Sequence, residues 1–179
     1  ISLPRILGSD GAGVVCEVGK ETKGFKVGDD VIIHPGVYNP DCDVSKSGHE
    51  NLSPSYGILG ETYDGVQSEF VCLDPTHLYP MPAHLSYAEA SSMGLTFMTA
   101  YEMLIKKARI QKDDLVLIYG GTSGVGSAGI QIAKDMGCRV ISTVGSDDKI
   151  KYVQEIGADH VVLHNSDLYS NLKRYLGRE

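Results

Sequence analysis

The glycines between residues 120 and 129 are the residues of this sequence whose types and spacing carry the clearest chemistry. An apolar run of strand length, 115–119, precedes them, and apolar residues recur at helical spacing from Val125 to Met136. A tight glycine turn between a strand and a helix lets the backbone approach a pyrophosphate closely. The helix N-terminus also offers free N–H groups and the positive end of its dipole. The stretch therefore predicts a dinucleotide-binding site.

These glycines fit two frames of the dinucleotide fingerprint. Gly124, Gly126 and Gly129 match G-x-G-x-x-G literally, but Gly129 would then lie a full turn into the helix. The other frame starts directly after the strand and has Gly121, Ser123 and Gly126. We prefer it because the first glycine has to turn the chain off the strand. The cofactor-binding residues that it predicts are Gly121, Thr122, Ser123, Gly124, Val125 and Gly126. A turn that only packs the helix on the sheet is the alternative interpretation.

Strands and helices alternate in the second part of the chain, which we place at residues 92–179. A helix is predicted over 96–108, and a capping box, Ser86 to Glu89, begins a shorter helix before it. The predicted strands are 115–119, 139–144 and 161–163, and a helix follows each of them. This alternation predicts a parallel, right-handed βαβαβ unit, which is one half of a doubly wound Rossmann sheet.

The first part of the chain, residues 1–91, is rich in strands and turns. Strands are predicted at 13–19, 31–33 and 67–73, with glycine and proline residues between them. Residues 38–65 hold many Gly, Pro, Asn, Asp and Ser residues and are predicted to form a long ordered loop. The fold class is therefore α/β, with a mostly β domain followed by a dinucleotide-binding domain.

Composition argues against several classes of protein. The net charge is −7 and no basic run is present, which argues against nucleic acid and anionic membranes as partners. No apolar run approaches the roughly 20 residues of a membrane span. The N-terminus does not read as a signal peptide, and the chain begins and ends as if within a domain. The cysteines are widely spaced and form no C-x-x-C pair, so we expect reduced thiols in a cytoplasmic protein.

Several motifs in order carry a resemblance over nearly the whole chain. They are GSDGAGVVCEVG, FKVGDDVI, ENLSPSYGILG, LTFMTAYEML, GGTSGVGSAGIQIAK and GADHVV. This order resembles the medium-chain dehydrogenase/reductase superfamily, in particular its zinc-type alcohol dehydrogenase-like and quinone oxidoreductase-like branches. The resemblance implies a GroES-like substrate domain without its first part, then a Rossmann domain without its last half. It also implies an active site in the cleft between the two domains.

The resemblance predicts that no zinc is bound. Ser9 stands where the zinc dehydrogenases carry a ligating His, and Leu95 stands where they carry a ligating Cys. Serine is a poor zinc ligand and leucine cannot ligate. A third catalytic ligand would precede residue 1. The four-cysteine structural lobe of the superfamily is matched here by Asn39, Cys42, Ser45 and Ser53. A tetrahedral site needs four good ligands, so we expect neither zinc site.

The resemblance also bears on the choice of cofactor. It places Val144 where NAD-specific members carry the acidic residue that binds the ribose 2′-OH. Without that carboxylate a 2′-phosphate is not repelled; Ser146 can donate a hydrogen bond to it and Lys149 adds a positive charge. We therefore predict NADP rather than NAD. In the alternative interpretation Ser146 only caps the next helix, Lys149 is solvated, and Asp147 and Asp148 disfavour a phosphate.

Thr99 is the catalytic residue that we predict. It matches the position that lies against the nicotinamide in the superfamily. Alternatively, Thr99 is a helix residue whose hydroxyl bonds back to its own turn.

The resemblance implies an NAD(P)H-dependent oxidoreductase. Without zinc there is no Lewis acid, so hydride would go to an acceptor that is already electrophilic, a quinone or an α,β-unsaturated carbonyl. Two other functions stay open: a zinc-type alcohol dehydrogenase with degenerate metal sites, and a non-catalytic dinucleotide-binding protein. The expected partners are a small-molecule carbonyl or quinone substrate and further copies of the chain in a homo-oligomer.

Overall fold

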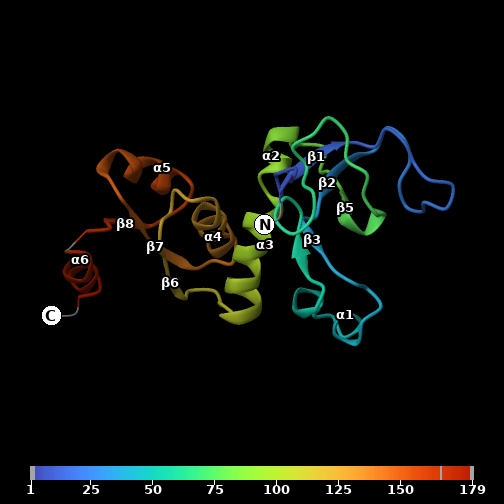
Figure 1. Ribbon diagram of the computed structural model, residues 1–179. Coiled ribbons are helices and arrows are strands. Elements are labelled where there is room, and N and C mark those ends of the chain that lie inside the picture. Colours follow the sequence, from blue (N-terminus) through green and yellow to red (C-terminus); the bar gives the residue numbers. More distant parts are fainter. Residues whose placement is uncertain (1–2, 166, 178–179) are drawn as a thin grey trace. The chain divides into compact units, whose positions relative to one another are not determined.

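The computed structural model describes residues 3–165 and 167–177 (Figure 1). The internal contacts divide the chain into two compact units, Ile1–Leu95 and Thr96–Glu179. The boundary that we predicted after residue 91 lies shortly before this division. Leu95 belongs to the first unit because its backbone N–H donates a hydrogen bond to the carboxylate of Asp10.

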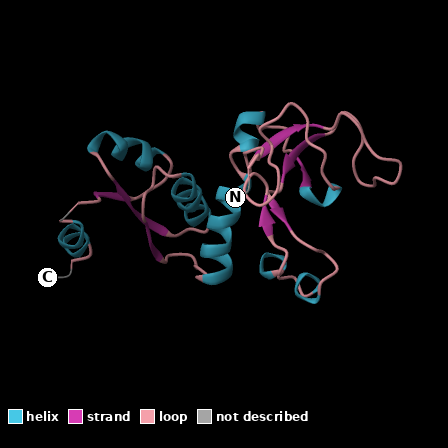
Figure 2. Ribbon diagram, in the orientation of Figure 1, coloured by secondary structure: helices cyan, strands magenta, loops and turns pink. Residues whose placement is uncertain are grey.

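The first unit contains two small antiparallel sheets. One holds β1 (Gly11–Val14), β2 (Asp30–Ile33) and β5 (Leu78–Pro80) in the order β1-β2-β5, and Gly11 pairs with Ile33. The other joins β3 (Gly36–Val37) to β4 (Gly57–Ile58). Loops make up much of this unit (Figure 2). The mostly β character that we predicted for it is confirmed.

Short helices complete the first unit. They are α1 (Asp43–Lys46), η1 (Glu50–Leu52), η2 (Pro75–His77) and α2 (Tyr87–Ser91). The predicted capping box is present at α2, because the Ser86 hydroxyl accepts the Glu89 N–H and the Glu89 carboxylate accepts the Ser86 N–H. The predicted loop over residues 38–65 was partly wrong, since α1, η1 and β4 lie within it.

The strand that we predicted at residues 67–73 was wrong. Backbone N–H groups of Gly65, Val66 and Gln67 donate to carbonyls of Ile6, Gly8 and Leu7. Beyond Gln67 no strand of the described residues pairs with this segment, and the Phe70 side chain is exposed. The local sequence favours an extended chain, but a strand also needs a neighbour to complete its hydrogen bonds.

The second unit is built on a parallel three-stranded sheet. Its strands are β6 (Leu115–Ile118), β7 (Arg139–Val144) and β8 (His160–Leu163), in the order β6-β7-β8. The helices that follow them are α4 (Gly124–Asp135), α5 (Ile150–Glu155), preceded by η4 (Asp147–Lys149), and α6 (Leu168–Tyr175). The predicted parallel βαβαβ unit is confirmed (Figure 1).

One predicted helix has a different form. The helix expected over 96–108 begins earlier as α3 (Gly94–Tyr101) and continues as a π-helical segment, η3 (Glu102–Lys107). It ends before Arg109, which has a φ of 53°. The N-terminal half of this helix is α-helical as predicted.

The hydrophobic core of the second unit lies between the sheet and its helices. Its buried side chains come from β6, β7, α4, α5 and the segments that join them: Ile110, Ile118, Ile130, Ala133, Cys138, Val140, Val144, Val153 and Ala158. Both faces of β7 are covered, because Val140 to Val144 are all buried. The middle strand is therefore fixed on every side, and its end is a rigid support for a site.

Candidate dinucleotide site

The glycine turn joins the carboxyl end of β6 to the N-terminus of α4. Gly120 has a φ of 66°, a conformation that favours glycine, and it turns the chain off the strand. Ser123 is the N-cap residue of α4, and its hydroxyl accepts the N–H of Gly126 at 3.0 Å. The serine in the middle place of the fingerprint therefore acts as a helix cap.

Three glycines of the turn lie where a side chain would collide. A Cβ atom at Gly126 would lie 2.2 Å from the carbonyl oxygen of Gly120, and one at Gly121 would lie 2.4 Å from the hydroxyl of Ser142. A Cβ atom at Gly124 would lie 2.7 Å from the methyl group of Thr96. The glycines thus allow helix and strand to pack closely, as both interpretations of the fingerprint require.

Free backbone donors distinguish this turn from a purely structural one. Residues 122–124 are exposed at the carboxyl edge of the sheet. Within the described residues, the N–H groups of Thr122, Gly124 and Val125 have no hydrogen-bond partner. Unpaired amides at the N-terminus of a helix bind anions well. The predicted residues therefore fit the pyrophosphate of a dinucleotide.

The end of β7 is the second part of the candidate site. Gly145 is exposed, with no atom within 4 Å of a Cβ placed there. Ser146 precedes η4, but its side chain makes no capping hydrogen bond. Its hydroxyl instead donates to the carboxylate of Asp148, and this bond, together with the charge of Lys149, lowers the pKa of Asp148. A phosphate here would compete with Asp148 for both Ser146 and Lys149.

Val144, at the position where NAD-specific members carry an acidic residue, lies in the interior of the second unit. Its side chain is only 1% exposed and belongs to the hydrophobic core. A carboxylate placed at Val144 would be buried without a partner. The neighbouring Gly145 is exposed, with open space where a side chain would begin.

Thr99 lies on α3, close in sequence to Thr96, whose methyl group faces Gly124. The side chain of Thr99 is half-buried. The second unit thus brings the helix that carries Thr99 to the glycine turn, although the two are more than twenty residues apart in the sequence.

The two catalytic zinc positions also come together, in the first unit. The Ser9 hydroxyl donates to the backbone carbonyl of Leu59 at 2.7 Å. Asp10, directly after Ser9, accepts the N–H of Leu95. At these two positions the Ser9 hydroxyl is hydrogen-bonded to the backbone and the Leu95 side chain is apolar. Neither side chain is suited to bind zinc.

Three of the four positions of the structural zinc lobe form a hydrogen-bonded cluster. Cys42 Sγ lies 3.1 Å from Ser45 Oγ and 3.5 Å from Ser53 Oγ, and Ser53 lies 3.1 Å from Ser55 Oγ. Hydrogen bonds with Ser45 and Ser53 lower the pKa of the Cys42 thiol to about 7. His49 contacts Ser47 instead of Cys42. In the part of the chain that the structure describes, no three His, Cys, Asp or Glu side chains are grouped as a metal site.

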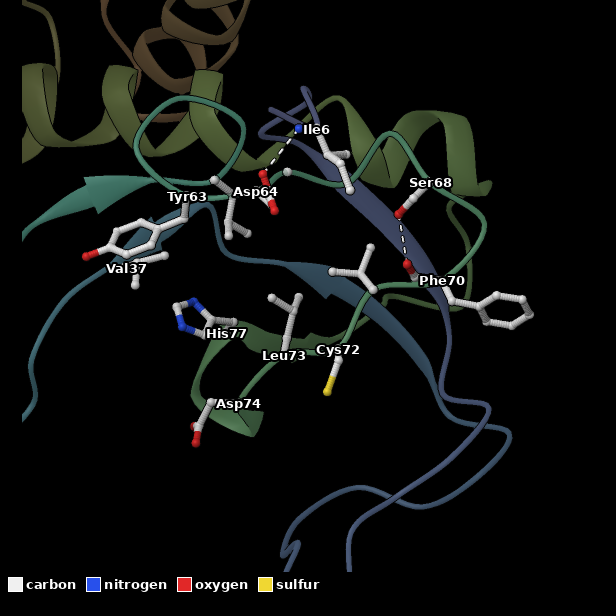
Figure 3. Close-up of a pocket in the computed structure, with 13 residues that line it drawn as sticks. Ile6, Val37, Tyr63, Asp64, Ser68, Phe70, Cys72, Leu73, Asp74 and His77 are labelled. Carbon is white, nitrogen blue, oxygen red and sulfur yellow. Dashed lines mark hydrogen bonds between the residues drawn. The ribbon is translucent and has the colours of Figure 1, made fainter. Parts of the chain in front are cut away.

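A pocket of about 340 Å³ lies elsewhere in the first unit. Figure 3 shows Tyr63, Asp64, Phe70, Leu73 and His77 around it. None of the predicted site residues lines this pocket. Its walls include the segment after Gln67 that has no strand partner, so its shape depends on what packs against that segment.

Comparisons with known proteins assign both units. Residues 1–83 match the alcohol dehydrogenase GroES-like domain, and residues 124–179 match the zinc-binding dehydrogenase family. A crystal structure of an NAD-dependent alcohol dehydrogenase superimposes with a TM-score of 0.95 at 42% identity, over 99% of this chain and 52% of that one. The chain belongs to the medium-chain dehydrogenase/reductase superfamily.

Within the superfamily, several relatives are reductases. Crotonyl-CoA carboxylase/reductase from Cereibacter sphaeroides is 36% identical over 88% of this chain and 37% of its own length. Human quinone oxidoreductase is 29% identical over 99% of this chain and 46% of its own length. The chain thus spans about half the length, or less, of these relatives. No helix within the described residues is long and apolar enough to cross a membrane.

Sequence reasoning missed two features of the candidate site. Gly120 turns the chain off the strand, although the preferred fingerprint frame begins at Gly121. Two consecutive glycines in the sequence could have indicated that the turn starts one residue earlier. The buried hydroxyls of Ser142 and Thr143 contact the glycine turn from β7. The sequence does not show which backbone groups two polar side chains within a strand will bind.

Proposed function

We propose that the protein is an NAD(P)H-dependent oxidoreductase that transfers hydride without zinc. The observation that carries this proposal is the glycine turn at the carboxyl end of β6, with unpaired amides at Thr122, Gly124 and Val125. Parallel α/β sheets bind dinucleotides at this edge. The membership of both units in the dehydrogenase/reductase superfamily supports the proposal.

Different residues of the second unit would bind different parts of the cofactor. The amides of the turn and the dipole of α4 would bind the pyrophosphate, with Ser123 holding the first turn of the helix in place. Thr99, on the helix beside this turn, would contact the nicotinamide ring. The bound cofactor supplies the hydride, and the chain supplies orientation and hydrogen bonds.

We propose an α,β-unsaturated carbonyl or a quinone as the acceptor. Such acceptors are electrophilic without a Lewis acid. They suit this chain because Ser9 and Leu95 do not provide a set of zinc ligands. The names of relatives support this class: crotonyl-CoA reductase, quinone oxidoreductase and the tomato 2-methylene-furan-3-one reductase. A solved 2-octenoyl-CoA carboxylase reductase from Streptomyces sp. is 31% identical, with a TM-score of 0.89 over 98% of this chain and 45% of that one.

We propose NADPH as the preferred cofactor. The open backbone at Gly145, the Ser146 hydroxyl and the exposed charge of Lys149 support it. NADH is the second candidate, because the structure that is 42% identical is named an NAD-dependent alcohol dehydrogenase.

Consumption of reduced cofactor tests the proposal. The purified protein is mixed with NADPH or NADH and, in turn, a quinone, a 2-enoyl thioester and a simple aldehyde, while nicotinamide absorbance is followed. We expect turnover with the first two acceptors and no dependence on added zinc. Turnover only with the aldehyde and zinc would favour an alcohol dehydrogenase. Binding of cofactor without turnover of any acceptor would favour a non-catalytic protein.

A further inference from the structure

Two hydroxyl side chains lie buried side by side in the middle strand of the second unit. Ser142 and Thr143 are both 0% exposed, although β7 is otherwise apolar apart from Arg139 at its start. Successive residues of a strand point to opposite faces of the sheet, so the two hydroxyls approach their partners from opposite faces. Buried polar groups are costly unless they are hydrogen-bonded, which raises the question of what they bind.

Both hydroxyls bind the backbone around the glycine turn. The Ser142 hydroxyl donates to the carbonyl of Ile118, the last residue of β6, at 2.8 Å. The Thr143 hydroxyl accepts the N–H of Gly120 at 2.9 Å, and the Thr143 carbonyl accepts the N–H of Gly121 at the same distance. These three bonds fix the chain on both sides of Tyr119, where it leaves the strand.

The same bonds set the conformation that the turn needs. Gly120 has a positive φ, and its carbonyl oxygen leaves no room for a side chain at Gly126. The Ser142 hydroxyl would lie 2.4 Å from a Cβ at Gly121, so the strand packs closely against the turn. A shift of the Gly120 amide would therefore move the amides of Thr122, Gly124 and Val125 with it.

We infer that Ser142 and Thr143 are positioning residues of the dinucleotide site. They hold the glycine turn so that its free amides converge on the pyrophosphate before the cofactor arrives. This inference rests on the proposed binding of a dinucleotide at that turn. Because the pyrophosphate is common to NADPH and NADH, the two residues act on both cofactors equally, unlike Lys149.

The substitution Thr143→Val tests this inference. It keeps the shape of the side chain and removes the acceptor of the Gly120 N–H, while Thr143→Ser keeps a hydroxyl. Titrations with NADPH and NADH, followed by nicotinamide fluorescence, should show binding of both weakened about tenfold in Thr143→Val, with their ratio unchanged. Thr143→Ser should recover most of the loss, and hydrogen exchange of the Gly120 amide should be faster only in Thr143→Val.

Thermal unfolding of each variant separates positioning from general loss of structure. Titrations are made well below each midpoint, so that the folded fraction is the same. The inference is overturned if Thr143→Val binds both cofactors like the parent, if only one cofactor is affected, or if Thr143→Ser loses as much as Thr143→Val. A parent protein that binds neither cofactor overturns the proposed function itself, whereas normal parent binding with an unaffected Thr143→Val overturns only the positioning role.

Discussion

The residues after β7 decide how much positive charge a 2′-phosphate would meet. Lys149 is exposed, and the neighbouring Asp148 accepts the Ser146 hydroxyl; this bond and the charge of Lys149 lower the pKa of Asp148. A 2′-phosphate would therefore have to displace the Asp148 carboxylate before it could bind Ser146 and Lys149. Asp148 should therefore weaken the preference for NADPH that we propose for Lys149.

Replacing Lys149 by alanine should weaken NADPH binding and leave NADH binding unchanged. The loss of one exposed charge-assisted contact corresponds to roughly 5- to 10-fold in affinity. Asp148→Asn should have the opposite effect, because it frees Ser146 and removes a repulsive charge. Both effects should shrink at high salt. Fluorescence titrations of the two cofactors measure this, with Lys151→Ala as the matched exposed control.

Equal effects of Lys149→Ala on both cofactors would contradict a 2′-phosphate site. An acidic side chain should be introduced at Gly145 rather than at Val144, since Val144 is in the core. Gly145→Asp should favour NADH by repelling the phosphate and offering the ribose an acceptor.

The thiol of Cys42 should react with alkylating reagents at lower pH than an ordinary cysteine. Its pKa is lowered to about 7 by hydrogen bonds with Ser45 and Ser53, so the thiolate predominates above neutral pH. Mass spectrometry of iodoacetamide labelling against pH measures this. Ser45→Ala should move the labelling curve of Cys42 to higher pH, while the curves of the exposed Cys16 and Cys72 stay in place. A Cys42 curve that does not respond to Ser45→Ala would refute the assignment.

At the level of elements, one acidic residue ties α4 to the amino ends of β7 and β8. Asp159 lies just before β8; both of its carboxylate oxygens accept from Lys134 of α4 at 2.8 Å, and it also accepts the N–H of Val140 at 2.7 Å. Burial raises the pKa of Asp159, but the bonds from Lys134 and Val140 outweigh it, so the pKa lies below its ordinary value.

This arrangement predicts an acid-sensitive contribution to stability. Because the folded-state pKa is lowered, the contribution is present above the ordinary pKa of about 4 and is lost as pH falls below it. Urea unfolding between neutral pH and about pH 3 should therefore show a smaller loss of stability in Asp159→Asn than in the parent. Asp135→Asn, on the exposed side of the same helix, is the control. An unchanged pH dependence in Asp159→Asn would show that the ion pair is too well solvated to matter.

At the level of the whole molecule, we predict that a chelator leaves the thermal unfolding midpoint unchanged. Hydroxyl and thiol groups take three of the four places of the structural zinc ligands and already bond to one another, and an amide, Asn39, takes the fourth. Calorimetry before and after dialysis against a chelator measures this, together with elemental analysis. A fall in the midpoint that added zinc restores would mean that the chain binds zinc through ligands other than those considered above.

Local patterns were enough to predict most of the second unit. The bounds of β7 follow from the sequence alone, because an apolar run ends at glycine. In the first unit the capping box of α2 is equally local, since it depends on residues three apart. The glycine turn and the cap at Ser123 are equally local. Alternation of strands and helices then implies parallel pairing, because a helix returns the chain to the same edge of the sheet.

Only the tertiary structure decided what depends on distant partners. Whether residues 67–73 form a strand depends on a neighbouring chain segment, and the burial of Val144 depends on how the helices cover the sheet. The roles of Ser142 and Thr143 depend on which backbone atoms the parallel register brings opposite them. The spacing of residues in the sequence shows which side chains share a face of one helix or strand. It does not show which residues of two different strands are joined by hydrogen bonds.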